Sequence, residues 1–358
     1  MKQLIRKSYM ITILIALLGS LVFLDACGSK PGTGAVLMEE DAIAPVAEGY
    51  ENVTPDYIFT YAENQNEDYP TTQGAREFAR LVNEKSQGRI RVRVYANAQL
   101  GDEASAVQQV QYGGIDFVRA SLAAITDYSE ETIVLMMPYL YQSPGHMWKV
   151  LDGEIGQEVM NSFTGSGLVP LAWYDAGVRS FYTRKPVSSI KGMKGLKIRV
   201  QPSSLMEDLV EELGAGAVPI NYEDVYDALQ TGTVDGAENN WSSYEAMDHY
   251  KVAPYFLSDE HSRTPELQLA SEQTMQQLSA QDRQMIRECA QESAVLEREL
   301  WQETEESSRQ KVLDEGCREI RLSDEEKQKF KDAVRPLYEQ YCGGYMEFIR
   351  RIEALGVQ

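Results

Sequence analysis

The sequence has few of the residues from which hydrolytic and metal-dependent active sites are usually built. It contains three histidines and four cysteines in 358 residues, and no HExxH, GxSxG or Walker phosphate-binding pattern occurs. No two cysteines have CxxC or zinc-site spacing. An enzyme would need an acid–base pair or a nucleophile with its base. These absences argue against an exported enzyme and against a bound metal or other cofactor.

Positive charge is also scarce. The chain has 34 Lys and Arg against 55 Asp and Glu, which gives a formal net charge of −21. So acidic a chain is unsuited to nucleic acid and to anionic lipid surfaces. An anionic ligand would need a local cationic pocket. The apolar content of 43% suffices for a large core in one or two domains.

The apolar run at the N-terminus is too short to cross a membrane as a helix. It extends from Met10 to Leu24, and the basic residues Lys2, Arg6 and Lys7 precede it. A transmembrane helix needs about 20 apolar residues, whereas a run of this length after basic residues is typical of a secretory signal peptide.

The segment Leu24-Asp25-Ala26-Cys27 resembles the processing signal of bacterial lipoproteins. We therefore expect residues 1–26 to be a lipoprotein signal peptide, Cys27 to be lipidated, and residues 27–54 to form a flexible tether. An ordinary signal peptide with a chance cysteine is the alternative. We expect the mature protein at the outer face of the cell membrane, as a lipid-anchored protein, or in the periplasm.

Three cysteines remain in the predicted folded part, Cys289, Cys317 and Cys342. Cys289 and Cys317 lie along one long helical pattern, too far apart to pair in a straight helix. Free buried thiols are one interpretation, and a bridge between Cys317 and Cys342 is the other.

The stretch from Lys194 to Trp241 predicts a strand–helix–helix–strand unit. Apolar residues alternate over 196–200, and two capped helical patterns follow over 205–213 and 222–229. A second short strand is expected at 234–237. Arg199 and Asn239 then fall at the ends of the two strands, where ligands bind in open α/β sheets.

The rest of the chain predicts two similar α/β lobes with mostly parallel sheets, because strands alternate with helices at βαβ spacing. We assign 55–175 with about 262–300 to the first lobe, and 176–261 with about 301–358 to the second. From Ser279 to about Leu313 one helical pattern continues, long enough to cross both lobes.

Six motifs in order resemble the solute-binding subunit of TRAP (tripartite ATP-independent periplasmic) transporters, the DctP family. The resemblance covers about residues 55–355. The motifs are Gln99-Leu100-Gly101-Asp102, Gly113-Gly114-Ile115-Asp116, Leu135 to Leu140, Gly195-Leu196-Lys197-Ile198-Arg199, Leu229-Gln230-Thr231-Gly232 and Val234 to Asn239.

This resemblance implies a two-lobed fold of the periplasmic-binding-protein type, with hinge strands and a long helix spanning both lobes. It implies a small organic acid in the cleft and small and large membrane subunits as partners. The family's typical carboxylate-binding arginine matches Arg199; Arg179, Asn239 and Tyr222 match further binding positions. A guanidinium suits this role because it can donate two hydrogen bonds to a carboxylate. Arg179 could instead pair with an acid such as Asp175.

The remaining candidate residues suggest a polar cleft, because most of them follow strands. They are Glu63, Asn64, Arg119, Trp241 and His261. Arg119 could offer a second cation or merely balance Glu63. Hydroxyl-binding side chains and a tryptophan face favour a sugar acid, such as a uronate or aldonate. A dicarboxylate or a sialic-type acid is the alternative ligand, and a ligand-sensing subunit that contacts a receptor is the alternative role.

Overall fold

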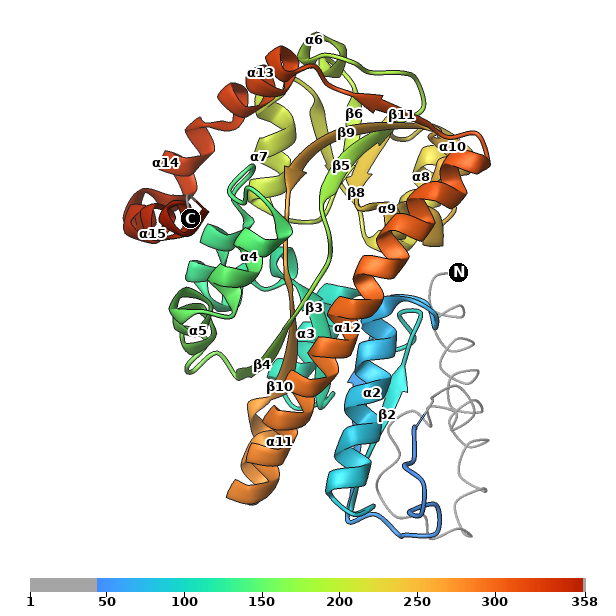
Figure 1. Cartoon of the computed structure of the whole chain (residues 1–358), viewed down its shortest axis with the longest axis vertical. Helices are drawn as coiled ribbons and strands as arrows, with labels where there is room; N and C mark the ends of the chain where they lie inside the picture. Colours follow the sequence, from blue (N-terminus) through green and yellow to red (C-terminus); the bar gives the residue numbers. More distant parts are fainter. Residues whose placement is uncertain (1–43, 357–358) are drawn as a thin grey trace, which may run out of the picture. The chain divides into compact units, whose positions relative to one another are not determined.

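The computed structural model describes residues 44–356, which form two β-sheets with helices packed around them (Figure 1). The predicted signal peptide and Cys27 lie outside the described residues. Within residues 44–356, no helix combines the length and the apolar character that crossing a bilayer requires.

The first sheet has the order β2-β1-β3-β10-β4. Its strands are β1 (Tyr57–Ala62), β2 (Ile90–Tyr95), β3 (Phe117–Ser121), β4 (Leu168–Tyr174) and β10 (Glu266–Ser271). Strands β1, β2 and β3 are parallel, as the βαβ spacing predicts, and β10 runs antiparallel between β3 and β4. The first residue of β10 therefore lies at the same edge as the last residues of β3.

The second sheet has the order β11-β9-β5-β8-β6-β7. Its strands are β5 (Arg179–Thr183), β6 (Lys197–Val200), β7 (Gly216–Pro219), β8 (Gly236–Asn239), β9 (Tyr255–Ser262) and β11 (Arg318–Arg321). The predicted strand–helix–helix–strand unit lacked β7, which pairs with β6 between the two helices. Only four residues form this edge strand, and its Gly and Pro gave no strand signal.

One long helix, α12 (Ala280–Asp314), contacts elements of both sheets (Figure 1). It packs against α2 (Pro70–Lys85) and β4 of the first sheet and against α9 (Trp241–Ala246) of the second. Ser279 caps it by accepting a hydrogen bond from the Asp282 backbone N–H, as the sequence pattern predicts. At 35 residues, the helix is about 50 Å long.

The other helices cover the faces and edges of the two sheets. They are α3 (Glu103–Gln111), α4 (Pro144–Leu151), α5 (Glu154–Asn161), α6 (Ile190–Met193), α7 (Ser204–Glu212), α8 (Val225–Thr231), α10 (His249–Val252), α11 (Glu272–Gln277), α13 (Asp324–Val334), α14 (Pro336–Cys342) and α15 (Met346–Gly356). Helix α14 contacts α7, while α15 contacts α4. The C-terminal segment is thus not confined to the second sheet, which differs from the predicted lobe boundary.

The end of the predicted tether is part of the folded unit. Ala47 is buried, and its backbone N–H donates to the Asn83 side chain at 3.0 Å. Gly88 approaches Val53 and Tyr50 so closely that a Cβ at this position would lie 2.8 Å from the Val53 side chain. The tether prediction is therefore wrong for residues 47–53, where contacts with Asn83 of α2 and with Gly88 of the α2–β2 turn fix the chain.

The cysteines of the described region are free and buried at Cys289, Cys317 and Cys342. The bridge between Cys317 and Cys342 is therefore absent, and the interpretation as buried thiols is confirmed. Cys342 lies in the main apolar core with residues of α7 and α15, whereas Cys317 belongs to the core of the second sheet.

Candidate functional site

A cavity of about 670 Å³, its opening to solvent included, is lined by residues that follow strands of both sheets. Its lining includes Asn64, Gln65, Tyr69, Glu103, Ala104, Arg119, Ala123, Ala124, Arg179, Arg199, Gln201, Pro202, Asn221, Tyr222, Glu223, Asn239, Asn240, Ser243 and Glu266. Six of the nine residues predicted for the site lie in it: Asn64, Arg119, Arg179, Arg199, Tyr222 and Asn239.

Arg199 is a buried cation without an acidic partner. Its side chain leaves β6, is 2% exposed, and donates from Nε to the Ile220 carbonyl at 2.7 Å. Within residues 44–356 it forms no salt bridge. Burial lowers the pKa of Arg199, and the charge of Glu238 offsets this only in part. Its two terminal nitrogens are therefore available to an anion in the cavity.

Arg179 is buried as well, but an acid already balances its charge. Strands β5 and β8 are antiparallel neighbours, so Arg179 lies beside Glu238 and Asn239. Its Nη2 donates to Glu238 Oε1 at 2.9 Å, and its Nη1 donates to Asn239 Oδ1 at 3.1 Å. Burial lowers the pKa of Arg179, but Glu238 outweighs burial, and the net shift is upward. The partner is thus Glu238 and not Asp175.

His261 supports this ion pair from outside the cavity. Its ring stacks on Phe181 with centroids 4.4 Å apart, its Nδ1 lies 2.9 Å from Asp259 Oδ2, and its Nε2 lies 3.6 Å from Glu238 Oε2. Burial lowers the pKa of His261, yet Asp259 and Glu238 more than offset it and raise the pKa to about 9. His261 is therefore a charged part of the protein interior and is not proposed as a ligand contact.

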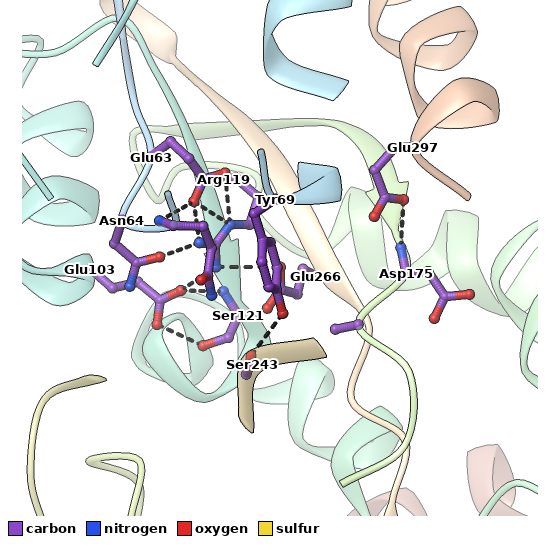
Figure 2. A network of polar contacts seen from close by, with 12 residues as sticks. Glu63, Asn64, Tyr69, Glu103, Arg119, Ser121, Asp175, Ser243, Glu266 and Glu297 are labelled. Atoms are coloured by element: carbon purple, nitrogen blue, oxygen red, sulfur yellow. Dashed lines mark hydrogen bonds and ion pairs between the residues drawn. The ribbon is translucent and has the colours of Figure 1, made fainter. Parts of the chain in front are cut away.

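On the first sheet, Arg119 is surrounded by acceptors (Figure 2). It pairs with Glu63 and hydrogen bonds to Asn64. Its Nη1 lies 2.9 Å from Glu103 Oε1 and 3.3 Å from Glu266 Oε2. We call these five residues the Arg119 cluster. Burial lowers the pKa of Arg119, but the three carboxylates outweigh burial and raise it well above its usual value. Arg119 thus does more than balance Glu63, and its donors are already occupied.

Side chains from the two sheets meet across the cavity. The Tyr69 hydroxyl and Ser243 Oγ are 2.7 Å apart (Figure 2). Gln201 Nε2, which follows β6, donates to Ser121 Oγ of β3 at 3.2 Å. These contacts link the two sheets beside the cavity. The side-chain amide oxygen of Gln201 has no hydrogen-bond partner in the described part of the chain.

Two further sequence candidates do not line the cavity. The Trp241 ring stacks on Phe256 with centroids 3.5 Å apart and belongs to the apolar core of the second sheet. Its position after β8 suggested a sugar-facing ring, but the chain turns into α9 there and directs the ring into the core. Glu63 is fully buried behind Arg119. Neither residue is proposed to contact ligand.

The sequence reasoning missed three acids that line this cavity, Glu103, Glu223 and Glu266. Glu103 is the first residue of α3, directly after the capping residue Asp102. Its place in a loop-to-helix turn after a parallel strand was a usable signal. Glu266 gave no such signal, because only the antiparallel direction of β10 brings it opposite Ser121 at the cavity edge.

The donor set offers no metal site, since no cluster of three or more His, Cys, Asp or Glu side chains within residues 44–356 is arranged to hold a cation. What the geometry offers is a polar cavity with one unpaired cation at one side and a net acidic cluster at the other.

The family model for DctP, "Bacterial extracellular solute-binding protein, family 7", matches residues 61–343. The chain belongs to the DctP family of TRAP solute-binding proteins. This DctP protein is 37% identical to a solute-binding protein of Chromohalobacter salexigens over 280 residues, which are 78% of this chain and 83% of that protein. The family consists of extracytoplasmic proteins that bind solutes and are not enzymes.

Solved structures show the same two-lobed fold. A TRAP periplasmic solute-binding protein of Bradyrhizobium, in complex with galacturonate, is 37% identical with a TM-score of 0.80, over 83% of this DctP protein and 99% of that chain. One from Shewanella oneidensis with bound succinate is 26% identical with a TM-score of 0.82, over 85% and 100%. The predicted two-lobed fold with a long spanning helix is confirmed.

Proposed function

We propose that this DctP protein captures a sugar acid, a uronate or an aldonate, and binds its carboxylate through Arg199. The observation that carries the proposal is the buried guanidinium of Arg199, which has no acidic partner among residues 44–356. An unpaired buried charge is costly, and a ligand carboxylate would relieve that cost. Asn239 and Tyr222 line the cavity beside it.

The rest of the cavity supports a ligand with several hydroxyl groups. Gln65 Oε1 and Gln201 Oε1 are buried without hydrogen-bond partners in the described region, and both residues line the cavity. Hydroxyl groups would donate to such carbonyl oxygens. The galacturonate bound by the Bradyrhizobium protein has this chemistry, and that protein is more similar in sequence than the succinate-binding one.

Substitution of Arg199 tests the proposal. Arg199→Ala should weaken the binding of the preferred acid by about 2–5 kcal/mol, because one partner of a buried charge pair is removed. Arg199→Lys should also weaken binding, since the two-pronged geometry is lost. Arg351→Ala is the matched control, because Arg351 pairs with Glu158 on the surface and does not line the cavity.

A thermal-shift screen should select the ligands for this test, followed by titration calorimetry. Uronates, aldonates, dicarboxylates, sialic acid and keto acids should be compared, since a ligand that binds the folded state raises the melting temperature. A shift with simple dicarboxylates alone would contradict the sugar-acid assignment. Unchanged affinity in Arg199→Ala would remove Arg199 from the site.

We also propose that Cys27 is lipidated and that the loaded protein delivers its ligand to small and large TRAP membrane subunits. The Met10–Leu24 run followed by Cys27 supports the anchor. In cells that make the full chain, Cys27→Ser should move the protein from the membrane fraction to the soluble fraction. Membrane retention of that variant would contradict the anchor. Uptake of the acid that fails without the membrane subunits would separate transport from a sensing role.

A further inference from the structure

The Arg119 cluster carries more negative than positive charge, whatever the protonation state of Glu266. Arg119 contributes one positive charge, and Glu63, Glu103 and Glu266 contribute up to three negative charges. Burial raises the pKa of Glu266 to about 8, although Arg119 opposes it. With Glu266 protonated the cluster is still net negative by one unit, and with all three acids ionised by two.

The donors of Arg119 are already used within the cluster. Nε and Nη2 donate to Glu63, Nη2 also to Asn64, and Nη1 to Glu103. Its side chain is 2% exposed, so it cannot swing out to meet a second anion without abandoning these partners. The sequence suggested Arg119 as a possible cation for a second carboxylate, and these contacts leave it unavailable for that role.

Two acids of the Arg119 cluster face the cavity and have room for further hydrogen bonds. Glu103 and Glu266 line the cavity and keep 17% and 12% of their side-chain surface exposed, whereas Glu63 is fully buried. Glu103 also accepts from Ser121 Oγ at 2.8 Å, which fixes its orientation. Carboxylate oxygens accept hydrogen bonds from hydroxyl groups and repel a second carboxylate.

We propose that the Arg119 cluster is a specificity determinant that admits the hydroxylated end of a sugar monoacid and excludes a second carboxylate there. The proposal rests on the proposed function, in which Arg199 holds the first carboxylate. The protein thereby selects aldonates and uronates against aldarates, the diacids with the same carbon chain and hydroxyl groups.

Galactonate and galactarate form a matched test pair, because both are open-chain six-carbon acids that differ only in a terminal CH₂OH or carboxylate. Calorimetric titration of the unmodified mature protein at neutral pH, with galacturonate alongside, should show galactarate binding at least about 100-fold more weakly than galactonate. A like charge placed against the cluster costs several kcal/mol, and each tenfold in affinity corresponds to about 1.4 kcal/mol.

Variants assign the discrimination to the cluster. Glu103→Gln removes a negative charge from the cavity wall, so at neutral pH it should narrow the ratio of galactonate affinity to galactarate affinity at least about tenfold. Because burial raises the pKa of Glu266 to about 8, Glu266→Gln should narrow this ratio only above about pH 8, where the native carboxyl is ionised. Glu158→Gln is the control, because it removes an equal charge from the surface ion pair with Arg351, and it should leave the ratio unchanged. If one cavity variant fails to unfold cooperatively, the other decides at the pH where its effect is expected.

Each outcome has one meaning. A galactarate affinity within tenfold of the galactonate affinity overturns the exclusion. The exclusion is also overturned if galacturonate binds and neither open-chain acid does, because the ring form and not the charge then determines which acid binds. An unchanged affinity ratio at neutral pH in folded Glu103→Gln overturns the role of the cluster. Failure of all monoacids, with another acid bound through Arg199, overturns the proposed sugar-acid function instead.

Discussion

Three arginines line the same cavity, and their partners give them three different roles. Arg199 has no acidic partner in the described chain, Arg179 has one in Glu238, and Arg119 has three. All three are at least 94% buried, so exposure does not distinguish them. Because charge balance is what differs, an incoming carboxylate is expected at Arg199 alone.

Glu238 is the acid on which the second sheet's buried charges depend. Glu238→Gln leaves Arg179 and charged His261 without their shared carboxylate. We expect the free energy of unfolding to fall by about 3–5 kcal/mol, as when one partner of a buried ion pair is removed. Urea unfolding at neutral pH measures this. Glu158→Gln should change it by less than about 0.5 kcal/mol, and a Glu238→Gln effect that small would contradict the prediction.

At the scale of elements, α2 lies close against α12 at Gly74. A Cβ at this position would lie 2.9 Å from Glu297 Cβ and 3.0 Å from the Tyr174 hydroxyl oxygen. Alanine normally favours a helix by about 1 kcal/mol over glycine. Here we expect Gly74→Ala to destabilise the protein by about 1–3 kcal/mol, because the two helices must separate.

Thermal unfolding checks this prediction, with Gly344→Ala as the control. A Cβ at Gly344 has no neighbour within 4 Å. We expect the melting temperature to fall for Gly74→Ala and to stay nearly constant for Gly344→Ala. Equal melting temperatures for Gly74→Ala and the unmodified protein would mean that the helices have room to adjust.

Most strands and long helices could be predicted, because their apolar period and caps are local properties of the sequence. The strand that includes Arg199 and the helix from Ser279 are examples. β7 could not be predicted, since its pairing with β6 is a tertiary property. The antiparallel direction of β10 could not be predicted from local sequence either, so the position of Glu266 at the cavity edge could not be predicted.

For the site, the strand-end rule found Arg199, Asn239, Asn64 and Arg119, which all line the cavity. The rule says where a residue lies but not where its side chain points. Trp241 lies one residue beyond the lining residue Asn240, yet its ring enters the core. Whether the lining residues contact a ligand stays a prediction.

At the scale of the whole molecule, shifted pKa values predict how stability depends on pH. Burial raises the pKa of Glu238, but Arg179 and His261 outweigh burial and lower this pKa to about 2. The ionised Glu238 therefore stabilises the folded protein at neutral pH, and this stabilisation is lost only as the pH falls from 4.5, the pKa in the unfolded chain, towards 2. The raised pKa values of His261, about 9, and Glu266, about 8, mean that the folded protein holds extra protons at neutral pH.

Stability therefore rises with pH below about 4.5 and falls as pH increases towards about 9, by roughly 1 kcal/mol per pH unit for each extra proton. Urea unfolding across this range should show greater stability near pH 5 than at pH 9 by a few kcal/mol. His261→Gln should make the free energy of unfolding depend less on pH between about pH 7 and 9, because the folded variant lacks the proton that His261 holds. A free energy of unfolding that rises steadily up to pH 9 would contradict the raised pKa values of His261 and Glu266.

The buried thiols make the protein suited to distance measurements in solution. Burial raises the pKa of Cys289 and of Cys342 to about 12, and Cys317 is also shifted upward by burial. Because thiolates are the reactive form, these positions should resist maleimide dyes. In a soluble form without Cys27, cysteines introduced at exposed Tyr112, beyond α3, and at exposed Glu212, at the end of α7, should accept dyes selectively. Energy transfer between the two dyes then reports how far apart the two sheets stand before and after a sugar acid is added.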